Sequence, residues 1–331
     1  MFKRPRLSAP NSLVNALPAL VLLFLVPACS QPADTPTTPL PDAKSGVEDT
    51  DIVLPAVWST RDLGSPVASI ALADALGSTI AVAFQNGDVQ FIDFEGERIT
   101  EKVASGVRKF ADGRYLMMSG VPVTIFPAIN LDGDIQILFH GGDLSEPISY
   151  DLDTGIEGTV VGLCTAPPQT EADGVIRIGF WTAEEPNSLQ SGRIVEVDDA
   201  LVFLADEPVT AESPIAACLL GETGATVFSA PARAAASLKR RGRDHVVTLD
   251  TSGNFSISTD QGPPQTLGIK DGITIRMPVL PIDMAGTGDT RSGGYPGGMI
   301  IIAGVDPEGE HLIVFVDASK LTLTPFAAPD L

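Results

Sequence analysis

The chain has 331 residues, with 42 acidic residues against 21 lysines and arginines and a formal net charge of −21. This excess of acid argues against a nucleic-acid-binding role, which needs cations to neutralise phosphates. Hydrophobic residues make up 44% of the chain, which supplies a core and excludes wholesale disorder. The 32 glycines and 27 prolines favour many turns and short strands over packed helices.

The N-terminus has the pattern of an export signal. Lys3, Arg4 and Arg6 form a basic segment, and an apolar run follows over 13–26. That run is shorter than the roughly 18–20 apolar residues that a membrane-spanning helix needs. We therefore interpret residues 1–28 as a signal peptide that is removed from the mature protein.

The signal ends in Val-Pro-Ala-Cys at 26–29. A small residue directly before a cysteine, at the end of an apolar run, resembles the bacterial lipobox. The resemblance implies that the chain is cut before Cys29 and that this cysteine carries acyl chains, which together attach a protein stably to a membrane. Ser30 after the cysteine, rather than aspartate, implies the outer membrane. An ordinary signal peptide that happens to contain a cysteine is the alternative.

Residues 29–50 form a separate segment. Proline, threonine and acidic residues dominate it, and a segment with so little to bury is expected to be a disordered, semi-extended tether. An ordered N-terminal strand is the alternative. The rest of the chain, 51–331, has no second linker, since the Pro/Gly stretch at 286–298 lies between apolar strands. We expect one domain at 51–331, because all-β domains reach that size as one unit.

Strand–turn–strand units recur along this domain. The apolar run 79–84 is followed by Asn86-Gly87, which is a strong hairpin signal, and by a second strand at 89–92. Similar apolar strands and polar turns follow at 134–142, 175–197, 245–257 and 299–316.

Helical periodicity is weak throughout. The best helical candidates are two short segments, 232–240 and 71–76. Hairpins repeated over about 280 residues predict an all-β fold, which we interpret as a β-propeller. At roughly 40–50 residues per blade, the domain has room for five or six blades. A pair of β-sandwiches is the alternative.

Catalytic motifs are scarce. His140, His245 and His311 are far apart, and no two of them have zinc-ligand spacing, so we interpret them as surface or structural residues. The chain has no nucleophile elbow and no phosphate-binding P-loop. The glycine-rich stretch 286–294 lacks the third glycine of a dinucleotide fingerprint, and we interpret it as a flexible loop.

One stretch is a weak candidate for calcium. Residues 130–134 contain Asp132 and Asp134 and resemble the start of a calcium loop, but they lack its acidic close. Asp-Gly is also a hairpin signal, so turn formation explains the same residues.

One basic cluster stands out in this acidic chain. It could hold phosphate or an acidic headgroup, because lysine and arginine are the usual partners of such anions. A solvated loop is the more common role for such a run. The cluster consists of Lys239, Arg240, Arg241 and Arg243.

Two cysteines, Cys164 and Cys218, remain besides Cys29. Each lies at the end of an apolar run. An exported chain meets an oxidising compartment, in which an even pair permits a disulfide. Two small buried thiols are the alternative, and the sequence leaves the choice open.

The stretches around these cysteines resemble the β-propeller phytases. Val-Gly-Leu-Cys at 161–164 is similar to the family's Tyr-Gly-Leu-Cys, and 215–224 is similar to the stretch around its second cysteine. Residues 270–274 and 295–302 resemble later segments of the family, in the same order along the chain. The resemblance implies a propeller whose acidic central face binds calcium and, through it, the phosphates of phytate, with a bridging water attacking phosphorus.

The sequence departs from the family where the calcium ligands would lie. Ala216 occupies the position of an acidic residue, and 220–221, 229–231 and 303–305 lack the family's carboxylates. The acids that remain as weak candidates are Asp132, Asp134 and Asp271. Losing even a few carboxylates should abolish a site for several calcium ions, because nothing else there offsets phosphate repulsion.

We therefore expect a lipid-anchored protein of the cell envelope whose phytase-like propeller binds a small-molecule ligand or an envelope protein. No cofactor and no nucleic-acid partner are expected. The alternative is a calcium-dependent 3-phytase, a phosphomonoesterase that releases phosphate from phytate. It would bind calcium through the three remaining aspartates and phosphate through the basic cluster at 239–243.

Overall fold

The computed structural model describes most of the domain expected at 51–331. The predicted signal peptide, Cys29 and the tether lie outside the described residues. The described residues belong to one unit of the chain, Ser45–Leu331. Only the backbone is described for Lys239, Arg240, Arg243 and Lys320. The described residues are 52–73, 78–118, 120–141, 144, 146–166, 175–198, 200–221, 224–240, 243–259, 263–288, 295 and 297–321.

Regular structure in these residues consists of β-strands and one short 3-10 turn, η2 (Ala318–Lys320). The predicted all-β fold class is therefore confirmed. The strands form five sheets within the described part of the chain. No helix found there is long and apolar enough to cross a membrane.

The first sheet shows how the sequence pattern becomes structure. All six residues of the apolar run Thr79–Phe84 are buried, and this strand pairs antiparallel with the next through the Asn86-Gly87 turn. The predicted pairs at 175–197, 245–257 and 299–316 are antiparallel neighbours as well. The strands of the first sheet, in spatial order, are β2 (Val67–Leu72), β3 (Thr79–Phe84), β4 (Asp88–Asp93) and β5 (Val103–Ala104).

The second and third sheets are antiparallel and repeat this plan, with one extra strand each. The second contains β6 (Val107–Phe110), β8 (Val121–Asn130), β9 (Ile135–His140) and β10 (Ile148–Asp151), with β7 (Arg114–Met118) also paired to β8. The third contains β11 (Val160–Thr165), β12 (Ile176–Thr182), β13 (Ser188–Val197) and β14 (Ala200–Ala205), with β15 (Val209–Thr210) also paired to β13.

The fourth sheet is small and the fifth is large. The fourth contains β16 (Ile215–Leu220) and β17 (Ala225–Ser229). The fifth runs in the spatial order β18 (Ala232–Arg240), β19 (Arg243–Asp250), β20 (Phe255–Thr259), β21 (Gln265–Lys270), β1 (Ile52–Ser59), β24 (His311–Asp317), β23 (Met299–Val305) and β22 (Leu280–Thr287).

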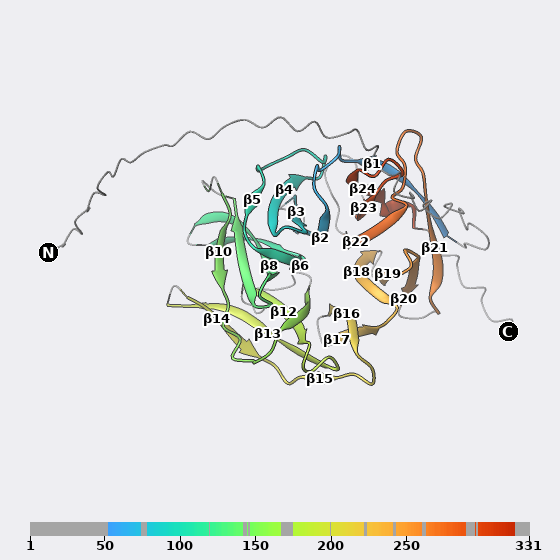
Figure 1. The fold of residues 1–331 in the computed structure, drawn as a ribbon. Coiled ribbons are helices and arrows are strands. Elements are labelled where there is room, and N and C mark those ends of the chain that lie inside the picture. The colour runs from blue at the N-terminus through green and yellow to red at the C-terminus, as the bar shows by residue number, and fades with distance from the viewer. Residues whose placement is uncertain are drawn as a thin grey trace, which may run out of the picture. The chain divides into compact units, whose positions relative to one another are not determined.

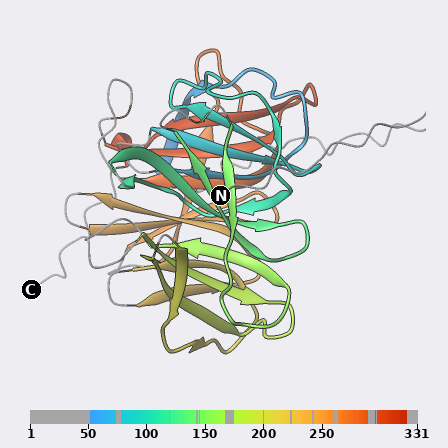
Figure 2. The ribbon, with the colours of Figure 1, turned by 90° about the vertical axis from the view of Figure 1, so that its left-hand side faces the viewer.

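Strand β1 joins the two ends of the described chain. Its first half pairs parallel with β21, and its second half pairs antiparallel with β24, with a register shift between Ala56 and Trp58. In Figure 2, this blue N-terminal strand lies among the red and orange C-terminal strands. The fifth sheet therefore depends on pairing between residues far apart in sequence.

The first strands of the strand groups follow one another around a common centre (Figure 1). Contacts connect β2 to β6, β6 to β11, β11 to β16, β16 to β18, β18 to β22, and β22 back to β2. Apolar clusters fill the space between neighbouring groups. Phe91 and Phe126 meet with ring centroids 5.6 Å apart between the first and second sheets, and Phe84 and Ile301 share a cluster between the first and fifth.

The helical candidate at 232–240 forms strand β18. Ala234, Ala236 and Leu238 are buried while the residues between them are partly exposed. That alternation fits a strand, and packing between neighbours overrides the helix propensity of alanine. Of the other helical candidate, 71–76, the first two residues end strand β2, and 74–76 lie outside the described residues.

Candidate functional site

A cavity of about 70 Å³ lies where the first strands meet. Its lining residues come from or adjoin β2, β6, β11, β16, β18 and β22, together with Trp181 of β12. We call it the central cavity. A polar cavity of this size holds several water molecules. Four of its lining residues are charged: Lys109, Asp112, Arg233 and Asp283.

Small residues let the strands approach closely beside this cavity. A Cβ atom added to Gly286 of β22 would meet Ala236 and Leu238 of β18 at 3.2 Å. Ala217, Ala235 and other alanines on these strands line the cavity itself. The alanine-rich sequence of β18 therefore serves packing at the centre of the fold.

Asp283 connects three strand groups. Its Oδ2 accepts hydrogen bonds from the Ser69 hydroxyl at 2.8 Å and from the Ile70 backbone N–H at 3.0 Å. The Ser69 hydroxyl oxygen in turn accepts from the Phe110 N–H at 3.2 Å. Through this chain of hydrogen bonds, Asp283 of β22 fixes β2 and β6, and its carboxylate is committed to neighbouring strands.

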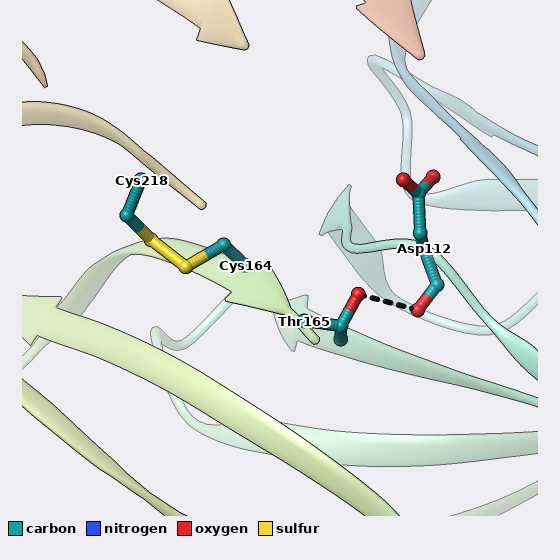
Figure 3. The surroundings of a disulfide bond; sticks show 4 residues. All are labelled: Asp112, Cys164, Thr165 and Cys218. Carbon is teal, nitrogen blue, oxygen red and sulfur yellow. Dashed lines mark hydrogen bonds between the residues drawn. A yellow bond between two sulfur atoms is a disulfide. The ribbon is translucent and has the colours of Figure 1, made fainter. Parts of the chain in front are cut away.

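Asp112 follows β6 and, like Asp283, connects neighbouring strands by hydrogen bonds. Its Oδ1 accepts from the Leu72 N–H at 2.8 Å, and the Gly113 N–H donates to the Leu72 carbonyl at 2.7 Å. The Thr165 hydroxyl of β11 donates to the Asp112 backbone carbonyl at 2.9 Å (Figure 3). Asp112 therefore joins β2, β6 and β11.

The two cations of the cavity differ from the two acids. Among the described residues, the side chains of Lys109 and Arg233 make no hydrogen bond or ion pair with another residue. Burial lowers the pKa of Lys109; Asp283 acts to raise it, while Arg108 and Arg233 lower it further. Arg233 is exposed, so solvent reaches the cavity past its side chain.

A disulfide forms part of the cavity wall. It joins Cys164 of β11 to Cys218 of β16, with Cα atoms 5.8 Å apart, across 54 residues of sequence (Figure 3). The sequence left this pair open between a bridge and two thiols. The bridge ties the small fourth sheet covalently to the third, and Trp181, Leu189 and Leu220 pack around it.

Residues 130–134 form the turn that the sequence offered as the alternative to a calcium loop. Asn130 Oδ1 accepts from the Asp134 N–H at 2.8 Å, and the Gly133 N–H donates to the Asn130 carbonyl. The same turn, with the same side-chain bond at 2.8 Å, recurs at 93–97, 250–254 and 306–310. Asp132 and Asp134 are exposed residues of such a turn.

The third weak calcium candidate, Asp271, is also used locally. Its Oδ1 accepts from the Met277 N–H at 2.8 Å in an exposed loop after β21. Within the described residues, no group of three acidic, histidine or cysteine side chains could hold a metal ion. Asp132, Asp134 and Asp271 belong to no such group, and calcium binding by them stays a hypothesis.

The basic cluster lies at a hairpin. Lys239 and Arg240 end β18, Arg243 begins β19, and Arg240 pairs with Arg243 in the backbone register. Arg241 lies outside the described residues, as do the side chains of the other three. Phosphate binding by this cluster stays a hypothesis.

The histidines have structural surroundings. His140 is buried and stacks on Phe91 with ring centroids 4.4 Å apart, and burial lowers its pKa. His245 is buried in β19. His311 Nδ1 accepts from the Val67 N–H at 3.4 Å, across the first and fifth sheets.

The four charged residues of the central cavity are not among the candidate site residues predicted from the sequence. Their one signal is a charge inside an otherwise apolar or small-residue strand, as in Ile-Asp-Met at 282–284 and Ala-Arg-Ala at 232–234. Such a charge does not reveal which other strand it faces. That information comes from the closure of the strands around the centre.

No family model and no curated protein matches this chain. Among solved structures, it is similar to a variant of AofleA from Arthrobotrys oligospora in which three arginines are replaced by alanine. That similarity has a TM-score of 0.50 at 10% identity, over 76% of this chain and 83% of that chain. AofleA itself has a TM-score of 0.49 at 11% identity over the same shares. At such low identity, the likeness to the variant concerns the fold alone.

Proposed function

We propose that residues 52–321 form a six-bladed β-propeller that acts as a binding module, held at the bacterial cell envelope by lipid on Cys29. The cyclic contacts of the first strands support this architecture, as does pairing of β1 with the last strand, which closes the ring. The blades are β2–β5, β6 with β8–β10, β11–β14, β16 with β17, β18–β21, and β22–β24 with β1.

The side chains of the central cavity favour a binding function over catalysis. A calcium-dependent phosphatase needs several carboxylates that converge on hard cations. In the described residues, the two acids of the cavity accept hydrogen bonds from neighbouring strands, whereas Lys109 and Arg233 have no such partners. A centre of this kind suits a ligand better than a metal ion, and any kinship with the β-propeller phytases is then one of fold.

The N-terminal sequence supports the location. The basic segment, the apolar run and Cys29 favour export and lipidation, and the Pro/Thr-rich residues 30–50 would hold the domain away from the membrane. The net charge of −21 disfavours further adhesion to anionic lipid surfaces. The proposed partners are the outer membrane, through the anchor, and a small-molecule ligand or an envelope protein.

The anchor is tested by fractionating cells that produce the full chain or its Cys29→Ser variant. We expect the full chain in the outer-membrane fraction, labelled by radioactive palmitate, and the variant unlabelled. A full chain that stays unlabelled and soluble contradicts the anchor.

Calcium separates the binding module from the phosphatase. We expect the melting temperature of the full chain to stay the same when millimolar calcium is added, because a chain without a calcium site gains no stability by mass action. Incubation with phytate should then release no phosphate. A calcium-dependent rise in melting temperature together with phosphate release would overturn the binding module in favour of the phosphatase.

A further inference from the structure

We propose that the central cavity binds a small oxyanion, a phosphate or a carboxylate, between the ammonium of Lys109 and the guanidinium of Arg233. This inference rests on the proposed binding function and names the ligand class of its site. It assigns a role to two charged side chains that make no hydrogen bond or ion pair within the described residues.

The hydrogen bonds of the cavity support an anion rather than a cation. Asp283 accepts from Ser69 and Ile70 through Oδ2 and from the Met284 N–H through Oδ1. In the described residues, the Asp283 carboxylate accepts three hydrogen bonds and Asp112 Oδ1 accepts one, whereas the side chains of Lys109 and Arg233 make none. Lys109 is half-buried and Arg233 is exposed, and a bound anion would supply charge-assisted hydrogen bonds to both cations.

The charges that act on Lys109 also favour an anionic ligand. Two guanidinium groups, of Arg108 and Arg233, and one carboxylate, of Asp283, act on it. The charges that line the cavity balance, Lys109 and Arg233 against Asp112 and Asp283. Arg108, which donates to the Val160 carbonyl at 2.6 Å, adds a further positive charge that acts on Lys109.

The volume of the cavity limits the size of the ligand. A cavity of about 70 Å³ has room for several water molecules, and hence for an anion of four or five heavy atoms that displaces them. Phytate, with six phosphates on a ring, does not fit. Arginine binds carboxylates and phosphates through paired donors, and lysine adds a compact charge. The open side at Arg233 gives such an anion a way in.

The test is isothermal titration of the full chain, in detergent, with potassium phosphate and separately with potassium acetate at constant ionic strength. We expect binding of at least one of the two anions. Lys109→Met and Arg233→Gln should each weaken it about tenfold or more, because each removes a charge-assisted hydrogen bond. Lys109→Arg, which keeps the charge, should retain most of the affinity.

Two surface changes serve as matched controls. Lys270→Met removes an exposed lysine of β21, and Arg276→Gln removes an exposed arginine that pairs with Glu308 at 3.1 Å. Both should leave the affinity within about twofold of the full chain, since exposed charges at a distance are screened by salt. Circular dichroism and melting of each variant check that it is folded.

The outcomes are distinct. Binding of phosphate alone or of acetate alone supports the site and identifies its chemistry. No binding of either anion overturns the inference, and so does binding that folded Lys109→Met and Arg233→Gln variants retain in full. If anion binding fails while the chain is membrane-anchored and inert towards calcium and phytate, the inference fails and the proposed function stands. Calcium-dependent phosphate release would overturn the proposed function itself.

Discussion

The turn at 250–254 and the central cavity use aspartates in opposite ways. Asp250 accepts hydrogen bonds from the N–H groups of Ser252 and Asn254, two and four residues away. Burial acts to raise its pKa, but the hydrogen bonds from Asn254, Ser252 and Gly253 hold the pKa below its ordinary value of 3.8. Asp283 instead accepts from Ser69, which is 214 residues away.

This difference separates two kinds of acidic residue in one chain. An acid that is satisfied by its own turn stabilises a hairpin locally and leaves nothing for chemistry. An acid that is satisfied across strands holds the centre together and sets the charge of the cavity beside it. A count of carboxylates along the sequence therefore overstates the acid that is free to bind metal.

The largest loss of stability should come from removing the disulfide in the cavity wall. Replacing both Cys164 and Cys218 by alanine should cost about 2–5 kcal/mol of unfolding free energy, because the bridge closes a long loop in the unfolded chain. Urea unfolding of the full chain and the double variant measures it. Finding both residues as reactive thiols in the denatured, unreduced chain would rule the bridge out.

The next largest difference in stability should appear between substitutions at Asp283 and at Asp250. Asp283→Asn should cost about 1–3 kcal/mol, because it removes the one carboxylate acting on Lys109 and weakens acceptors for buried donors. Asp250→Asn should cost only a few tenths of a kcal/mol, since asparagine accepts the same turn hydrogen bonds. Asn130 already occupies the equivalent position in its turn. Equal losses in urea unfolding would erase the distinction.

A double variant separates charge from packing at Asp283. Adding Lys109→Met to Asp283→Asn should recover part of the lost stability, because the uncompensated ammonium is then gone. Simple addition of the two single effects would mean that the two side chains do not interact.

The sequence predicts the hairpins and their turns well. The hairpins at 79–92 and 299–316 are confirmed because their apolar runs and their turns, Asn86-Gly87 in the first and 306–309 in the second, act within a few residues. The helical candidate at 232–240 forms a strand because packing between neighbouring strands overrides the helix propensity of alanine.

The central cavity is beyond this kind of prediction. Lys109 and Arg233 line one cavity because contacts connect β6 to β18 through β11 and β16, and no spacing along the chain encodes that arrangement. The resemblance to the phytases stays a hypothesis, and the positions expected for its ligands carry no carboxylates here. The site is thus a property of the closed fold, whereas the turns are properties of short peptides.

Replacing a turn glycine should have a smaller effect on stability. Gly309 has a φ of +87°, and a Cβ atom added there would meet nothing within 4 Å. Gly309→Ala should therefore cost about 1–2 kcal/mol from backbone conformation alone, while Gly309→Asn should cost less because asparagine tolerates this region. Equal stability of the alanine variant and the parent in urea unfolding would contradict the turn geometry.

The smallest effect is a pH dependence that belongs to the cavity alone. The pKa of Lys109 is lower in the folded chain than its ordinary 10.5, so the folded state loses this proton at a lower pH than the unfolded state does. Between the two pKa values, the unfolded state therefore binds more protons. Stability from this group therefore rises with pH, over the window from the lowered pKa up to 10.5. Subtracting the unfolding profile of Lys109→Met from that of the full chain isolates this slope. A bound oxyanion should reduce the slope at Lys109 by holding its proton in place.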